Sequence, residues 1–229
     1  MDILKYHIST GFFFILLSIF VPNGMNVIDA ACTLPEDLQS STWEYNYTDV
    51  SNTQQSKSLA ISTTTLRDSV ISLDGRGTTL DDWTCINGLT ISSTEGVVVF
   101  KSDSTYSDGP SNNYRLYLCM KFTKVTPDLY YFYLLSDIYE DVTPKERTFG
   151  TKDSPSNDAP ICSTFCQYTG TPPKIRTLRK PGTMDSLPSS TPLCACGSSC
   201  KSKAYSIDFN KTWTIVYVAV GLVFNFHIR

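Results

Sequence analysis

Apolar and polar residues alternate along much of this chain, in short runs separated by residues that favour turns. In the segment WEYNY at 43–47, Trp43, Tyr45 and Tyr47 fall on one face and polar residues fall on the other. Successive side chains of a β-strand point to opposite faces, so this alternation predicts strands with one buried face. Further strands are predicted at 59–65, 70–73, 89–91, 97–100, 114–122 and 129–135.

The two longest of these runs give the strongest hairpin signal. Residues 114–122 and 129–135 are separated by a short turn that contains Pro127, and so short a connection joins antiparallel strands. The turn signals DGRG at 74–77 and TEG at 94–96 separate other strand candidates. No segment has convincing helical periodicity. The pattern therefore predicts a mainly β fold, an antiparallel barrel or sandwich.

A change in composition divides the chain near residue 150. Residues 31–150 carry most of the strand signals, whereas residues 151–202 are rich in Pro, Ser and Cys. The second segment has one strand-like piece, KIRTLRK at 174–180. We therefore expect an antiparallel β core at 31–150 and a disulfide-bonded extension of the same domain at 151–202.

The first residues are typical of a secretory signal. Lys5 precedes an apolar run at 11–21, and the small residues Ala30 and Ala31 follow a polar stretch. The apolar run is shorter than the ~20 residues that span a bilayer and suits the central region of a signal peptide. We expect a signal peptide at 1–30 and an extracellular protein.

The C-terminal tail at 203–229 contains an apolar run at 213–226. A lipid-anchor signal consists of small residues, a polar spacer and an apolar end. Ser202 followed by Ala204 and a polar spacer fits this order, so Ser202 is a candidate attachment residue. A transmembrane helix and a last buried strand are the alternatives. We favour a lipid-anchored surface protein over a freely secreted one.

The eight cysteines all follow the predicted signal peptide. An even number of cysteines in an exported chain predicts up to four disulfides, whose connectivity the sequence leaves open. The C-x-C-x-x-x-C run at 194–200 has the alternative of binding a metal, which an oxidising compartment disfavours. The predicted disulfide cysteines are Cys32, Cys85, Cys119, Cys162, Cys166, Cys194, Cys196 and Cys200.

Histidine occurs only at His7 and His227, in the predicted signal peptide and tail. The domain therefore has no imidazole base for a catalytic triad and no imidazole ligand for zinc. A glycosidase needs only two carboxylates, and calcium needs oxygen ligands. We interpret the acids as solvated loop residues, and expect no enzyme, cofactor or metal. These acids are Asp81, Asp82, Asp137, Glu140, Asp141 and Glu146.

The net charge of −3 gives no drive toward nucleic acid. The one basic cluster is at 174–180, where Lys174, Arg176 and Lys180 share one face of a strand. Such a face suits a sulfated glycan, or it protects a sheet edge. We favour edge protection.

Aromatic residues supply the candidate ligand contacts. Tyr131 and Tyr133 share one face of the strand at 129–135, and Trp43 lies on the first strand. These three residues are candidates to face a ligand, with burial in a core as the alternative. The sequons at Asn46 and Asn210 predict N-glycosylation.

Two families are similar to parts of this sequence. The opening CTLPEDLQ at 32–39, the WTC at 83–85 and the cysteines at 162 and 166 resemble uncharacterised extracellular cysteine-rich domains of marine invertebrates. That resemblance implies a secreted or surface protein and no established activity. The sequence also resembles lipocalins, which have a tryptophan on their first strand, in the position of Trp43. This resemblance implies a barrel that carries a small apolar ligand. The glycine that precedes this tryptophan by two positions in lipocalins is Ser41 here.

The expected function is therefore binding rather than catalysis. The favoured hypothesis is a non-enzymatic recognition protein on a disulfide-stabilised β scaffold, with an extracellular protein or glycan as partner. The alternative is a lipocalin-like carrier of a small apolar ligand.

Overall fold

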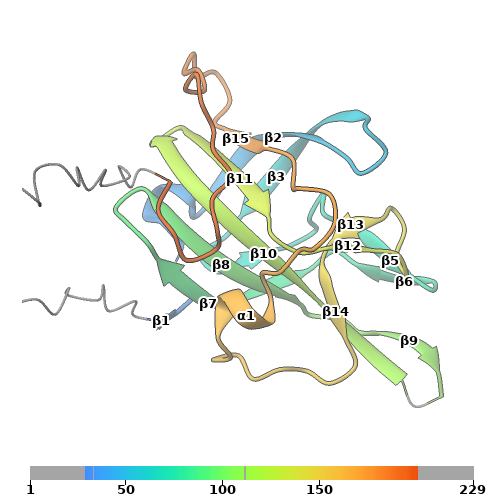
Figure 1. Cartoon of the computed structure of the whole chain (residues 1–229). Coiled ribbons are helices and arrows are strands. Elements are labelled where there is room, and N and C mark those ends of the chain that lie inside the picture. Colours follow the sequence, from blue (N-terminus) through green and yellow to red (C-terminus); the bar gives the residue numbers. More distant parts are fainter. Residues whose placement is uncertain (1–28, 33, 111, 201–229) are drawn as a thin grey trace, which may run out of the picture.

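The chain forms a nearly closed antiparallel barrel in this computed structural model, which describes residues 29–32, 34–110 and 112–200 (Figure 1). Strands that are consecutive around the barrel pair with one another, and the last strand returns beside the first. This is an up-and-down arrangement that leaves few open edges. The barrel strands are β2 (Ser41–Thr48), β3 (Gln54–Ile61), β7 (Trp83–Thr90), β8 (Glu95–Ser102), β10 (Asn112–Thr126), β11 (Leu129–Leu134) and β15 (Arg176–Arg179).

Shorter elements fill the gap between β3 and β7 and the two ends. Ser62 N donates to Thr65 O at 2.9 Å just after β3, and Thr65 then pairs with Thr84 of β7. The shorter elements are β1 (Asp29–Ala31), η1 (Glu36–Leu38), β4 (Thr65–Leu66), β5 (Leu73–Gly75), β6 (Thr78–Leu80), β9 (Tyr106–Gly109), β12 (Ile138–Tyr139), β13 (Glu146–Arg147), β14 (Phe149–Thr151) and the helix α1 (Ile161–Thr164).

The predicted hairpins are present. β10 and β11 pair in the register Phe122↔Phe132, and β7 pairs with β8 across the predicted turn. The DGRG turn joins β5 to β6, and Gly77 adopts φ +85° there, in the left-handed region that glycine tolerates. The fold class is therefore the predicted one, mainly β and barrel-like.

Large side chains fill the barrel interior. Trp43 and Tyr45 of β2 are at most 1% exposed and pack with Tyr130 and Phe132 of β11 and with Trp83 of β7. This is the face that the aromatic alternation predicts to be buried. Protein interiors are close-packed, and this interior follows that rule.

A second apolar core lies on the outer face of the same strands. Tyr117 of β10 and Tyr131 and Tyr133 of β11 are buried there against Ile161 and Phe165. The covering segments flank β15 at 152–175 and 180–200, and we call them the cover. Figure 1 shows this orange part of the chain crossing the face of the sheet. β10 and β11 are therefore buried on both faces.

All eight cysteines form disulfides, as predicted. Cys119–Cys166 joins β10 to the cover, and Cys32–Cys85 joins the N-terminal segment to β7. Cys162–Cys196 and Cys194–Cys200 lie within the cover. Four disulfides in a domain of this size are typical of extracellular proteins.

The strand-like piece at 174–180 has a larger role than the sequence indicates. It forms β15, which pairs with β11 on one side and β2 on the other and so completes the barrel. Leu178 points into the interior and is 1% exposed. The barrel therefore extends beyond the predicted boundary at residue 150, because β11 and β2 need a strand between them.

The short helix η1 covers one end of the barrel. Leu38 is buried in the interior, and its carbonyl accepts a hydrogen bond from the Trp43 indole at 3.4 Å. Asp37 accepts a hydrogen bond from the Tyr130 hydroxyl at 2.8 Å and forms an ion pair with Lys124 at 2.5 Å. These contacts fix η1 to the starts of β2 and β11 and to the end of β10.

Several predicted features lie outside the described residues. These are most of the predicted signal peptide at 1–30, the tail at 203–229, Ser202 and the sequon at Asn210. Asp29 and Ala30, at the end of the predicted signal, form part of β1 and pair with Leu89 and Gly88. Within the described part of the chain, no helix has the length and apolar character needed to cross a membrane.

Candidate functional site

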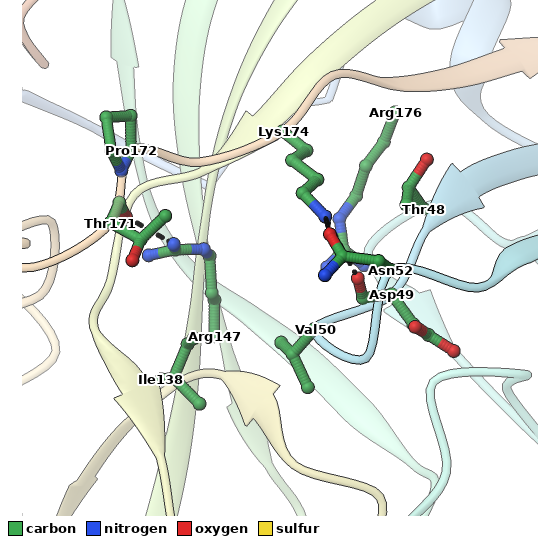
Figure 2. Close-up of a pocket in the computed structure, with 10 residues that line it drawn as sticks. All are labelled: Thr48, Asp49, Val50, Asn52, Ile138, Arg147, Thr171, Pro172, Lys174 and Arg176. Carbon is green, nitrogen blue, oxygen red and sulfur yellow. Dashed lines mark hydrogen bonds between the residues drawn. The ribbon is translucent and has the colours of Figure 1, made fainter.

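A pocket of about 180 Å³ opens at the barrel end opposite η1, where β2 and β15 meet the β12–β13 hairpin. Figure 2 shows its walls, with Arg147 on one side and Lys174 and Arg176 on the other. We call it the cationic pocket. It is lined by Thr48, Asp49, Val50, Asn52, Ile138, Arg147, Thr171, Pro172, Lys174 and Arg176.

Arg176 is an internal part of the barrel wall. Its guanidinium donates to both carboxylate oxygens of Glu146, at 2.9 and 2.6 Å, and to the Tyr45 hydroxyl at 2.5 Å. It also lies over the Tyr47 ring, 4.9 Å from the centroid. Burial opposes the charge of Arg176, but Tyr45 and Glu146 outweigh it and raise the pKa of this arginine. This cation is therefore fully neutralised by its bidentate partner.

Arg147 is equally buried and lacks such a partner. It is 6% exposed, and its guanidinium donates to two backbone carbonyls, Ser136 O at 2.9 Å and Thr171 O. Among the described residues it forms no ion pair. Burial and the neighbouring Arg176 lower the pKa of Arg147. A guanidinium nevertheless stays protonated in proteins, so Arg147 is a buried positive charge. The carboxylates of Asp137 and Glu146 act on it from a distance, and among the described residues neither forms an ion pair with it.

Lys174 adds a second cation on the facing wall. Its ammonium donates to the Asn52 side-chain oxygen and, at 3.5 Å, to the Asp49 carbonyl. The Asp49 carboxylate accepts hydrogen bonds from Thr53 N and Gln55 within its own turn, and Figure 2 shows it turned away from Lys174. The backbone N–H of Thr53 is the main cause that lowers the pKa of Asp49.

The pocket can therefore bind an anionic group. Two of its three cations, Arg147 and Lys174, form no ion pair in the described part of the chain. Buried charges are normally paired, and a guanidinium binds carboxylate, sulfate or phosphate groups in a planar, bidentate geometry. Thr48, Asn52 and Thr171 surround these cations with further polar groups.

The predicted basic cluster at 174–180 contributes to this pocket in part. Lys174 and Arg176 line it, whereas Lys180 lies at the other end of β15, paired with Asp128 at 3.0 Å and over the Trp43 ring. The cluster is therefore divided between the two ends of the barrel rather than gathered on one exposed face.

The three predicted ligand contacts are buried. Trp43 is in the barrel interior with no exposed surface. Tyr131 and Tyr133 are 4% and 6% exposed beneath the cover, and the Tyr133 hydroxyl donates to Thr191 O at 2.6 Å. Tyr131 also lines a cleft of about 230 Å³ between the sheet and the cover, beside Pro188 and Pro192.

The first sequon lies in the barrel wall. Asn46 is half-buried on β2 and pairs in the ladder with Thr177 of β15. Its neighbours Tyr45 and Tyr47 face the interior, so the Asn46 side chain points outward. Glycosylation at this residue stays a prediction.

A larger cleft lies at the η1 end and has a volume of about 400 Å³. Phe122, Tyr130 and Leu34 contribute apolar surface to it, and most of the other lining residues carry an acid, a hydroxyl or, in Lys124, an ammonium group, so the wall is mixed. An apolar ligand favours a predominantly hydrophobic cavity. The lining therefore gives little support to a carrier of small apolar ligands.

Arg147 is the residue that the sequence analysis missed. In the sequence it is one of several charged residues in a turn-rich segment after β11. Its burial results from contacts with Ser136 and Thr171, which tertiary structure brings together. No pattern in this segment of the sequence indicates that Arg147 is buried. No cluster of three or more potential metal ligands occurs in the described part of the chain.

Comparisons with known proteins give no assignment. No family model matches the sequence, and neither the curated proteins nor the solved structures include a significant match. The cationic pocket and the disulfide-bonded barrel are therefore the observations from which a function is proposed.

Proposed function

We propose that this protein is an exported, non-enzymatic binding module whose cationic pocket holds an anionic group of its ligand. One observation carries this proposal: Arg147 is a buried guanidinium in the wall of a pocket, and it forms no ion pair among the described residues. An incoming carboxylate or sulfate would neutralise it at short range, where the low dielectric makes the attraction strong.

Three further features support binding at this pocket. Lys174 adds charge on the opposite wall, and the Asn52 and Asp49 contacts hold its ammonium in position. Arg176 is kept rigid by Glu146 and Tyr45, so the wall is organised before a ligand arrives. The Asp49 carboxylate is occupied in its own turn.

The test is a titration of the disulfide-bonded protein with a single uronic acid and with its neutral methyl ester, followed by NMR. We expect shifts of the Arg147 and Lys174 signals with the acid alone. Arg147→Gln and, separately, Lys174→Gln should each weaken binding at least about fivefold, because a charge-assisted bond is worth more than about 1 kcal/mol.

Lys57→Gln is the matched control, since Lys57 is an exposed residue of β3 outside the pocket. It removes the same charge and should leave the affinity unchanged. Equal loss of affinity in Lys57→Gln and Lys174→Gln would mean that net charge, and not the pocket, attracts the anion. Equal binding of the acid and its ester would also contradict the proposal.

We further propose that the protein is held at the cell surface by a lipid anchor on Ser202. The spacing of small, polar and apolar residues after Cys200 supports this. A phosphatidylinositol-specific lipase should release the protein from expressing cells, and its intact mass should place the C-terminus at Ser202. Protein found free in the medium without lipase treatment would contradict the anchor and leave the binding proposal intact.

A further inference from the structure

A second cleft adjoins the cationic pocket and differs from it in charge. It has a volume of about 270 Å³ and lies between the end of β11, β14 and the residues after α1. Ile138 lines both cavities. We call this second cavity the aromatic cleft. It is lined by Ser136, Asp137, Ile138, Tyr139, Thr148, Phe149, Gly150, Thr164, Phe165 and Gln167.

Aromatic rings and uncharged polar groups share its walls. Tyr139 and Phe149 line the cleft and are half-buried. A Cβ at residue 150 would overlap the Tyr139 ring, so glycine there lets this ring lie against β14. The exposed Gln167 uses its Nε2 to donate to Ser163 O at 2.9 Å, which leaves its amide oxygen available as an acceptor.

Thr148 is a second observation that points to a ligand. It is 3% exposed and lines the aromatic cleft, and its Oγ1 makes no hydrogen bond to any residue that the structure describes. Most buried hydroxyls form a hydrogen bond, so a buried hydroxyl without one in the protein is expected to bind a water molecule or a ligand.

Charge fixes how a ligand would lie across the two cavities. Asp137 is the only charged residue in the aromatic cleft, and backbone N–H groups of Thr169 and Gly170 hold its carboxylate. The Thr169 N–H is the main cause that lowers the pKa of Asp137, which keeps it ionised. An anionic group is therefore repelled from the aromatic cleft and attracted to Arg147 and Lys174.

We infer that the ligand is an acidic saccharide, with its carboxylate or sulfate in the cationic pocket and a neighbouring sugar in the aromatic cleft. This inference rests on the proposed function and specifies its ligand class. A sugar ring has hydroxyl groups at its edge and apolar C–H faces, which match hydrogen-bonding side chains interleaved with aromatic rings. An acidic peptide carries several carboxylates, and Asp137 opposes those that would reach the cleft.

The experiment compares four probes by calorimetry: a uronic-acid-containing tetrasaccharide, its neutral methyl ester, the single uronic acid and an acidic hexapeptide. We expect the tetrasaccharide to bind at least about tenfold more tightly than the single acid, because it fills both cavities. Arg147→Gln should weaken both acidic sugars. Thr148→Val and Gln167→Ala should weaken the tetrasaccharide about three- to tenfold and leave the single acid unaffected.

The outcomes separate this inference from the proposed function. If the tetrasaccharide binds no better than the single acid, and Arg147→Gln still weakens both, the saccharide inference fails and the anion pocket stands. If neither the two acidic sugars nor the hexapeptide binds, or Arg147→Gln and Lys174→Gln change nothing, the proposed function fails. Tightest binding of the hexapeptide would replace the saccharide by a peptide partner.

Two features make the variants interpretable. Thr148→Val keeps the shape of the side chain and removes a hydroxyl that has no hydrogen-bond partner in the described part of the chain, so the fold should tolerate it. Gln167 is exposed, and its replacement removes one side-chain hydrogen bond. Unchanged tetrasaccharide affinity in both variants would overturn the inference.

Discussion

The barrel interior and the covered outer face are two apolar cores built on the same strands in different ways. In β10, Leu118 and Met120 face the interior, whereas Tyr117 and Cys119 face the cover. The interior is enclosed by strands that pair with their neighbours around the barrel. The outer core has a sheet on one side and an irregular, cross-linked chain on the other.

This difference shows which interactions stabilise the barrel interior and which stabilise the outer core beneath the cover. Ladder hydrogen bonds and close packing of aromatic rings stabilise the interior. The cover has few backbone hydrogen bonds to the sheet, so disulfides and buried polar contacts must supply its attachment. One of these contacts is Lys121, whose ammonium donates to Ala195 O at 2.5 Å and Ser198 O at 2.6 Å.

The largest effect is expected when the covalent link between the two halves is removed. Replacing both Cys119 and Cys166 by Ala opens a link across 47 residues, which the chain-entropy relation values at about 4 kcal/mol. The corresponding double variant of Cys194 and Cys200 opens a link across 6 residues, worth about 2 kcal/mol. Urea denaturation measures both free energies of unfolding.

Limited proteolysis of the same two variants sharpens the comparison. Loss of Cys119–Cys166 should expose sites in the cover at urea concentrations where the barrel strands remain protected. Simultaneous cleavage of cover and barrel would mean that the two cores unfold as one unit. An equal loss of stability in the two variants would contradict the assigned role of the link to β10.

A smaller loss is expected for Lys121→Met, which keeps the apolar stem and removes the ammonium. Lys121 is 3% exposed and donates to the carbonyls of Cys194, Ala195 and Ser198. Burial is the main cause that lowers the pKa of this lysine. We expect a loss of about 1–3 kcal/mol.

Hydrogen exchange should place this loss in the cover, with faster exchange at 194–200 than elsewhere. Lys101→Met is the matched control, because Lys101 is a half-buried lysine of β8 on the neighbouring strand. The control should change stability by less than about 0.5 kcal/mol. A uniform increase in exchange across the barrel would disagree with a local role for Lys121.

The smallest loss of stability is expected for a substitution at η1, where Asp37 contacts the end of the barrel. Burial opposes ionisation of Asp37, but hydrogen bonds from Lys124 and Tyr130 outweigh it and lower its pKa. A carboxylate whose pKa is lowered by folding contributes stability above its ordinary value and loses it as pH falls through the folded-state pKa. Asp37→Asn should therefore cost less than about 1 kcal/mol at pH 7.

The difference between Asp37→Asn and the unmodified protein should disappear as pH falls below the folded-state pKa. Unfolding free energies measured from pH 7 to pH 2 test this. Asp74→Asn is a suitable comparison, since Asp74 is exposed and its carboxylate accepts a hydrogen bond from Gly77 N alone among the described residues. A constant difference across the whole pH range would exclude the ion pair as its cause.

Much of the barrel was predictable because local sequence determines hairpins. The alternation at 43–47 and the runs that form β10 and β11 contain their own register and turn signals. The position of β15 was not predictable, since its two neighbours are distant in sequence. The burial of Tyr131 and Tyr133 likewise depends on a cover without regular structure of its own.

The candidate site was less predictable than the fold. Lys174 and Arg176 stood out as a basic cluster, but Arg147 came from a segment with no pattern. What makes Arg147 notable is that its guanidinium is buried and forms no ion pair with a carboxylate of the described residues, and this depends on its three-dimensional surroundings. Sequence patterns indicate which residues alternate and which strands pair. They do not indicate whether a buried charge forms an ion pair.

The position of Cys200, which is cross-linked to Cys194, determines the end of the barrel at which the described part of the chain stops. Cys200 N donates to Glu95 at the start of β8, the same end at which η1 contacts Lys124. The cationic pocket begins beyond Thr48, at the other end of β2. If residues beyond Cys200 attach the molecule to a surface, the barrel would stand between that surface and the pocket, and its binding end would point outward into the medium.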